Sequence, residues 1–252
     1  MPILIPVTWK DEFPVFGTDG KIPEKIEIKE RAGYNYNPLY TSDDFYPKAG
    51  LPKNRQLAPQ WQWNHQPDNK LWNLLPGGGL EIKTGKLCIN LTHARNTLTQ
   101  RMLWPKCEVR VNIDSSKLND GDYAGLCALQ SRYAFVGIKK ELGTAFLVVI
   151  LNNTDERPGM GSADYMPGDL VEKIRLDSVS ATVGIRASFK DGADTVDFYF
   201  LDKKGVPVSI GTKHKLSFSL AHFTGNRFGL CCFSTRKMGG TATFRNFEYI
   251  TE

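Results

Sequence analysis

The chain has 252 residues, which is enough for one large all-β domain or for two small ones. Its net charge of +5 comes from lysines and arginines dispersed among acidic residues, a pattern typical of a solvated surface rather than of a nucleic-acid partner. No apolar run approaches the ~20 residues that cross a bilayer, so no membrane partner is predicted. The five cysteines show no CxxC spacing, which argues against a disulfide framework and against zinc.

Three parts follow one another along the chain. Residues 1–24 contain one short apolar strand and then turns rich in glycine and proline, too little for a domain. Residues 25–42 read as a linker or wrapping arm, with charged residues first and tyrosines after them. From residue 43 to residue 252 the pattern is β throughout, so only this last part is expected to bury a sizeable core.

The strand signals of residues 43–252 are of two kinds. Cys107–Asp114 alternates strictly between apolar and polar residues, whereas 123–130 and 145–151 are continuously apolar. A change of phase near Arg245 and Asn246 predicts a β-bulge in the last strand. About a dozen short strands, with no helical period, indicate an all-β fold: a two-sheet antiparallel β-sandwich. Glycine-containing turns separate the strands at 77–79, 119–121, 190–192, 203–205 and 238–240.

The stretch QWQWNH alternates aromatic and amide residues, so a strand would carry the two sets on opposite faces. The first set is Trp61, Trp63 and His65, and the second is Gln60, Gln62 and Asn64. An aromatic platform beside fixed amide and guanidinium groups is the chemistry that binds a sugar. The alternative is that both tryptophans are core residues of the sandwich.

A polar run follows, in which Arg95, Asn96, Gln100 and Arg101 lie close together in the sequence. Arg95, Asn96 and Gln100 are candidates for binding sugar hydroxyls, whereas a structural role is favoured for Arg101. As buried groups, Arg95 and Asn96 would serve equally well as structural ties between sheet edges.

Several catalytic patterns are missing from the sequence. It has no GxSxG and no ExDxE strand, and its four histidines have no metal-ligand spacing. We therefore predict no catalytic residue in this chain. Asp43 and Asp44 are candidate ligands of a structural calcium ion, together with main-chain carbonyls.

Four motifs in a fixed order give the chain a family resemblance, which spans about residues 43–250. They resemble the C-terminal β-sandwich of family 43 glycoside hydrolases, the β-xylosidases and α-L-arabinofuranosidases. The resemblance implies a jelly roll of the concanavalin A-like type. The motifs are QWQWNHQPD at 60–68, THARNTLTQR at 92–101, DGDYAGLCALQSRYAFVGI at 120–138, and HFTGNRFGLCCFS at 222–234 followed by TATFRNFEYI at 241–250.

The resemblance also implies a partner. Residues 1–24 look like the end of the family's catalytic β-propeller, and 25–42 like its exit linker. The family's catalytic aspartates and glutamate would then lie upstream of Met1, so this chain is expected to be inactive alone. In related β-xylosidases a loop of the sandwich reaches the propeller's pocket with an aromatic side chain. Phe223, in the matching loop 221–225, is the candidate here.

Three functions fit these expectations. The leading one is a non-catalytic accessory domain, with a propeller in cis or in trans, that shapes the cleft for xylan or xylo-oligosaccharide. The second is an autonomous carbohydrate-binding module with its own xylo-oligosaccharide site. The third is a purely structural sandwich without sugar contact.

Overall fold

The computed structural model describes residues 4–18, 20–27, 31–152, 167–190, 194–217 and 224–251. The chain forms two compact units, Met1–Pro38 and Leu39–Glu252. None of the helices in the described ranges has the length and apolar character needed to span a bilayer.

The first unit contains an antiparallel hairpin of β1 (Val7–Lys10) and β2 (Phe13–Phe16). Its two turn residues, Asp11 and Glu12, both have positive φ angles, which is the backbone geometry that closes a two-residue hairpin loop. Large apolar side chains on the hairpin face solvent, and Trp9 is 72% exposed. A two-stranded hairpin is at best marginally stable alone, so these side chains lack the cover that would stabilise it.

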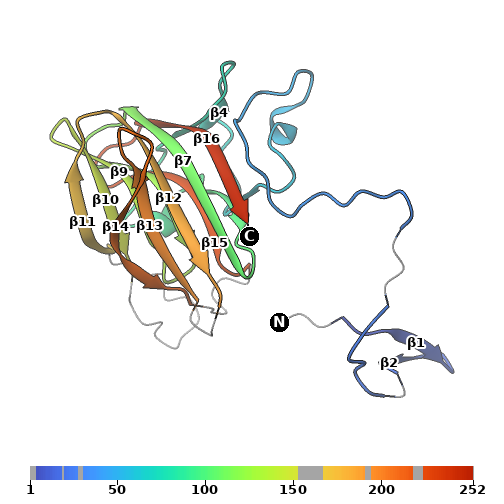
Figure 1. Ribbon diagram of the computed structural model, residues 1–252. Helices are drawn as coiled ribbons and strands as arrows, with labels where there is room; N and C mark the ends of the chain where they lie inside the picture. The colour runs from blue at the N-terminus through green and yellow to red at the C-terminus, as the bar shows by residue number, and fades with distance from the viewer. Residues whose placement is uncertain are drawn as a thin grey trace. The chain divides into compact units, whose positions relative to one another are not determined.

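The second unit consists of two seven-stranded sheets packed face to face (Figure 1). All pairs within both sheets are antiparallel, which confirms the predicted β-sandwich. Sheet I has the order β11 (Asp169–Arg175), β10 (Thr144–Leu151), β9 (Ala134–Glu141), β8 (Asp122–Leu129), β15 (Arg227–Ser234), β6 (Leu98–Arg101) and β3 (Gln62–Trp63). Sheet II has the order β14 (Pro207–Lys215), β13 (Thr195–Leu201), β12 (Ser180–Ser188), β7 (Lys106–Lys117), β16 (Thr241–Thr251), β5 (Leu80–Lys83) and β4 (Trp72–Leu74). Two single-turn 3-10 helices lie in the connections, η1 (Lys53–Arg55) and η2 (Leu91–His93).

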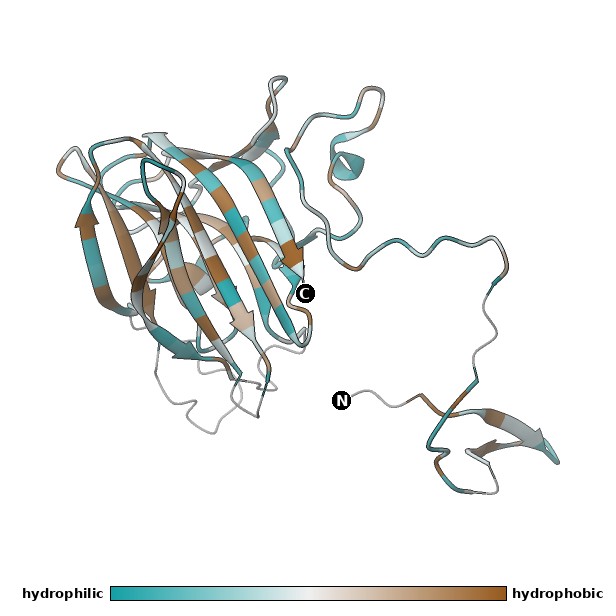
Figure 2. Cartoon of the chain, viewed as in Figure 1, coloured by the Kyte–Doolittle hydropathy of each residue, from teal (hydrophilic) through white to brown (hydrophobic). Residues whose placement is uncertain are grey.

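The main core lies between the sheets and follows from the alternation of the strands. On β7, Val109, Val111 and Ile113 are fully buried, while the residues between them are partly exposed and polar. Figure 2 shows the result as alternating apolar and polar bands along β7 and β16. Each fully buried side chain of this kind contributes roughly 1.5–3 kcal/mol relative to an exposed one.

A second apolar layer explains why 123–130 does not alternate. The face of β8 and β15 that points away from the main core is also covered, and Cys127 and Cys231 are fully buried there. Cys88, Leu91 and Ala94, from the segment around η2, are among the residues that pack over it. Because both faces are covered, the central parts of the two strands, 124–129 and 228–233, carry apolar residues and glycine without alternation.

The predicted bulge in β16 is confirmed. The pairing register between β16 and β7 shifts between Arg245 and Glu248, and Asn246 adopts a φ of 51°. The shift turns Phe247 into the core, where its ring lies 4.7 Å from the ring of Trp61.

Candidate functional site

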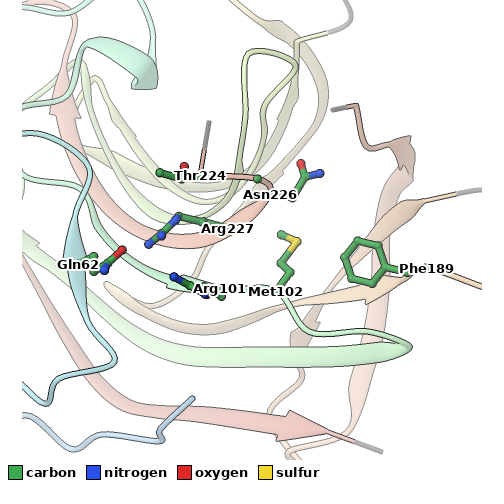
Figure 3. Close-up of a pocket in the computed structure, with 8 residues that line it drawn as sticks. Gln62, Arg101, Met102, Phe189, Thr224, Asn226 and Arg227 are labelled. Carbon is green, nitrogen blue, oxygen red and sulfur yellow. The ribbon is translucent and has the colours of Figure 1, made fainter. Parts of the chain in front are cut away.

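A polar hollow of about 530 Å³ opens at the edge of sheet I where β3, β6 and β15 lie side by side (Figure 3). We call it the β6–β15 hollow. It is lined by Gln62, Arg101, Met102, Phe189, Thr224, Gly225, Asn226 and Arg227.

Strand register places the polar side chains of the hollow on one face. Arg101 at the end of β6 lies directly opposite Arg227 at the start of β15. Gln62 of β3 lies opposite Thr99 of β6, two residues from Arg101 and therefore on the same face. This is the face of QWQWNH that carries the amides, and Gln62 is exposed on it.

Arg227 is held firmly within the hollow. It is only 5% exposed, and its Nη1 donates to Thr99 Oγ1 at 3.1 Å. Thr99 Oγ1 in turn donates to the carbonyl of Gln62 at 2.8 Å. Burial lowers the pKa of Arg227, and the positive charge of Arg101 lowers it further. Arginine nevertheless stays protonated in proteins, so the site retains its positive charge.

Neither guanidinium of the hollow has an acidic partner within the described part of the chain. Among the described residues, the buried Nε of Arg227 has no hydrogen-bond partner. By contrast, three other strand arginines, on β7, β12 and β16, each lie beside a carboxylate. These pairs are Arg110–Glu248 at 2.5 Å, Arg186–Glu108 at 2.8 Å and Arg245–Asp114 at 3.6 Å.

The remaining lining residues come from the turn before β15 and from the ends of two other strands. Gly225 has a φ of 70°, a left-handed conformation that glycine adopts without strain. Asn226 is fixed by its Nδ2, which donates to the carbonyl of Ser217 at 3.1 Å. Met102 and Phe189 supply the apolar part of the lining.

The aromatic members of the predicted sugar platform turn towards the core. Trp61 is 7% exposed, and its Nε1 donates to Asp43 Oδ2 at 2.9 Å. Trp63 is partly buried, and its ring lies 5.2 Å from that of Trp72. The structure therefore uses the Trp61 indole as a core group rather than presenting it to solvent. His65 is exposed, 3.3 Å from the carbonyl of Thr92.

The predicted amide ligands are buried and bind the main chain. Asn96 accepts from the amide of Asp68 and donates to its carbonyl, both at 3.0 Å. Gln100 makes the same two contacts with Thr41, at 2.9 and 2.8 Å. Both therefore act as ties between distant segments. Arg95 is exposed beside them.

The two candidate metal ligands have different surroundings. Both carboxylate oxygens of Asp43 accept protein hydrogen bonds, one from Trp61 and one from the amide of Phe45 at 2.7 Å. Asp44 is exposed. In the ranges that the structure describes, no group of three or more His, Cys, Asp or Glu side chains is arranged to hold a metal ion. Phe223, the predicted cleft residue, lies outside the described residues.

Sequence reasoning considered Arg101 but missed Arg227 and the pair that the two residues form in the hollow. Arg227 begins the strand RFGLCCFS, in which only it and the last residue are polar, and an arginine at such a position is a signal that sequence analysis could have used. Its position opposite Arg101 depends on the pairing of β6 with β15, which are more than a hundred residues apart in the chain.

Comparison with known proteins agrees with this architecture, which is that of a concanavalin A-like β-sandwich. Residues 53–250 match the model of the beta-xylosidase C-terminal concanavalin A-like domain. The chain belongs to this family, the C-terminal sandwich domains of family 43 glycoside hydrolases.

Individual relatives point the same way. A bifunctional GH43-CE protein of Bacteroides eggerthii has a TM-score of 0.81 and 34% identity, over 98% of this chain and 30% of that one. A GH43 enzyme engineered to show both endo-xylanase and exo-arabinofuranosidase activity has a TM-score of 0.81 and 26% identity, over 98% of this chain and 49% of that one. A beta-xylosidase of Formosa agariphila is 38% identical over 95 residues, which is 34% of this chain and 14% of that protein. The chain thus matches less than half the length of each relative.

Proposed function

We propose that this chain is a non-catalytic accessory domain that pairs with a family 43 catalytic β-propeller, in cis or in trans. In that role it forms one wall of the cleft that receives xylan-derived oligosaccharides. The observation that carries the proposal is the family match over residues 53–250, a domain that the family description places C-terminally in beta-xylosidases.

The location of the hollow in the sequence supports placing this domain beside the propeller's substrate cleft. The lining residues Thr224–Arg227 begin one residue after Phe223, the side chain that the family resemblance assigns to the propeller's pocket. A sugar held against the propeller at Phe223 would therefore have the hydroxyls and amides of the hollow within reach. His65 and Arg95 stay predicted sugar contacts, since both are exposed.

The hairpin supports the presence of a propeller partner. Val7, Trp9, Phe13 and Phe16 are all more than two-fifths exposed, and a cluster of large apolar side chains on a short hairpin is typical of a covered surface. We propose that β1 and β2 add to the propeller's last blade, which would bury them.

The test is kinetic. A purified family 43 propeller is assayed on xylo-oligosaccharides with increasing amounts of this chain. The proposal predicts a higher kcat/KM, because a cleft with both walls binds substrate better. An unchanged kcat/KM, together with binding of xylohexaose by the isolated chain in calorimetry, would favour the autonomous carbohydrate-binding module instead. Release of nitrophenol from an aryl xyloside by the pure chain would contradict its assignment as non-catalytic.

A further inference from the structure

We propose that the β6–β15 hollow is a carboxylate site, and that its ligand is a uronic acid carried as a side group on a xylan-type chain. The sugar part of this inference rests on the proposed function. The preference for an anion rests on the geometry of Arg101, Arg227 and Gln62.

The first argument is the cost of the arginine pair. Like charges directly opposite each other on neighbouring strands destabilise a sheet. Arg227 adds a second cost, because burying a cation without a charged partner is unfavourable. Elsewhere in the sandwich, arginines of β7, β12 and β16 have carboxylates beside them, whereas Arg101 and Arg227 have none among the described residues. An anion bound between the two guanidinium groups would offset both costs.

The second argument is orientation. The hydrogen bond from Arg227 Nη1 to Thr99 Oγ1 orients the guanidinium, and Arg227 is one of the residues that line the hollow. Such a fork matches the two oxygens of a carboxylate, which it binds with two parallel hydrogen bonds. Figure 3 shows the nitrogen atoms of Arg227 and Arg101 on the side of the hollow where Gln62 lies. The guanidinium of Arg227, which Thr99 orients, and that of Arg101 therefore lie on the side of the hollow where the anion would be bound.

The third argument concerns size and the rest of the lining. A volume of about 530 Å³ falls within the range of roughly 300–1,000 Å³ that is usual for small-molecule sites, and exceeds the needs of a single carboxylate. Met102 and Phe189 lie at the other end of the hollow, where they offer apolar surface to the C–H faces of a sugar ring (Figure 3). Thr224 is exposed and adds a hydroxyl that can bond to the hydroxyls of a sugar. An acidic pyranose uses all three kinds of lining, whereas a protein carboxylate uses only the arginines.

The experiment is a calorimetric titration of the full chain with xylotriose bearing one glucuronic acid. The matched ligands are the methyl ester of the same oligosaccharide, which removes only the charge, and unsubstituted xylotriose. We expect the acid to bind at least about tenfold more tightly than either neutral ligand, with an affinity that falls as salt is added.

Variants locate the binding. Arg101→Gln removes an exposed guanidinium without opening the core, and it should weaken binding of the acid about tenfold. Arg227→Lys keeps the positive charge but replaces the planar guanidinium, which can make two parallel hydrogen bonds, so it should also weaken binding of the acid. The control is Arg175→Gln, which removes an exposed charge from β11 at the opposite edge of sheet I and should leave the affinity unchanged. Circular dichroism of each variant checks that it folds.

Three results would overturn the inference. Equal affinity for the acid and its methyl ester would show that the charge is not recognised. Unchanged binding by Arg101→Gln would place the site elsewhere. Equally tight binding of N-acetylglutamate amide would assign the arginines to a protein carboxylate instead of a sugar. Each of these leaves the proposed accessory role standing, because that role is tested by the propeller's kinetics.

Discussion

Arg227 of β15 lies directly opposite Arg101 of β6, so two guanidinium groups share one face of sheet I without an acidic partner among the described residues. Such an arrangement lowers the stability of the empty domain and prepares it for an anion. It therefore links a measurable folding property to the proposed ligand.

The first prediction follows from that repulsion. Arg101→Gln should make the ligand-free domain more stable by about 0.2–1 kcal/mol, because it removes a like charge directly across the strand pair. Urea denaturation at low salt measures the change, and added salt should shrink it. A destabilised Arg101→Gln at low salt, with Arg175→Gln unchanged, would argue that Arg101 makes a favourable contact instead.

A second prediction concerns the indole of Trp61. Trp61→Phe keeps most of the ring packing against Phe45 and Phe247 but leaves Asp43 Oδ2 without its donor. We expect a loss of about 1–3 kcal/mol in the free energy of unfolding. Sugar affinity should not change, because the indole is buried. If the variant lost sugar binding while retaining its stability, Trp61 would be a ligand residue after all.

Gln100 gives a third prediction. Gln100→Ala removes both hydrogen bonds to Thr41 and leaves two main-chain groups of the segment unpaired. The domain should lose about 1–3 kcal/mol. Amide hydrogen exchange should accelerate around Thr41. The Thr41 amide is the most direct probe, because it donates to Gln100 Oε1 in the natural chain. The matched control is Thr97→Ala, three residues before Gln100, because the Thr97 hydroxyl has no hydrogen-bond partner in the part of the chain that the structure describes.

The pH dependence of stability gives a fourth prediction. His214 of β14 is 2% exposed, and burial lowers its pKa below the ordinary value of 6.5, with the charge of Arg132 acting in the same direction. The unfolded chain therefore takes up a proton more readily than the folded one. The stability from neutral His214 is present above the unfolded pKa and is lost as the pH falls through and below it.

Urea denaturation at about pH 7.5 and about pH 5.5 measures this loss. His214→Gln should lose less stability than the natural chain between the two values, whereas the exposed His65→Gln should behave like the natural chain. If His214→Gln and the natural chain lost the same amount of stability, another group would be responsible for the loss at low pH.

The sequence predicted the fold well where local pattern and packing agree. β7 alternates because one of its faces meets the core and the other meets solvent, and the change of phase near Asn246 corresponds to the bulge of β16. The site was harder to predict, because composition alone does not show which face of a strand looks outward. QWQWNH drew attention to its tryptophans, but the outward residue in the hollow is Gln62.

The roles of the candidate polar ligands were hard to predict for a related physical reason. Asn96 and Gln100 have the hydrogen-bonding groups of a sugar site, and the same groups satisfy the backbone of Asp68 and Thr41. Only the long-range contacts distinguish the two roles. The pairing of Arg101 with Arg227 is likewise a product of strand order, which a single sequence does not specify.

The most direct test of the accessory role is calorimetry between this chain and a family 43 catalytic propeller. We predict a one-to-one complex for the natural chain. The double variant Trp9→Ser, Phe13→Ser should weaken it, since these side chains are 72% and 74% exposed and are the proposed contact. Leu142→Ser, at an exposed apolar residue of the sandwich, is the control and should bind normally. Absence of a complex, or equal affinity for the double variant and the natural chain, would contradict the proposed role of the hairpin and of the domain.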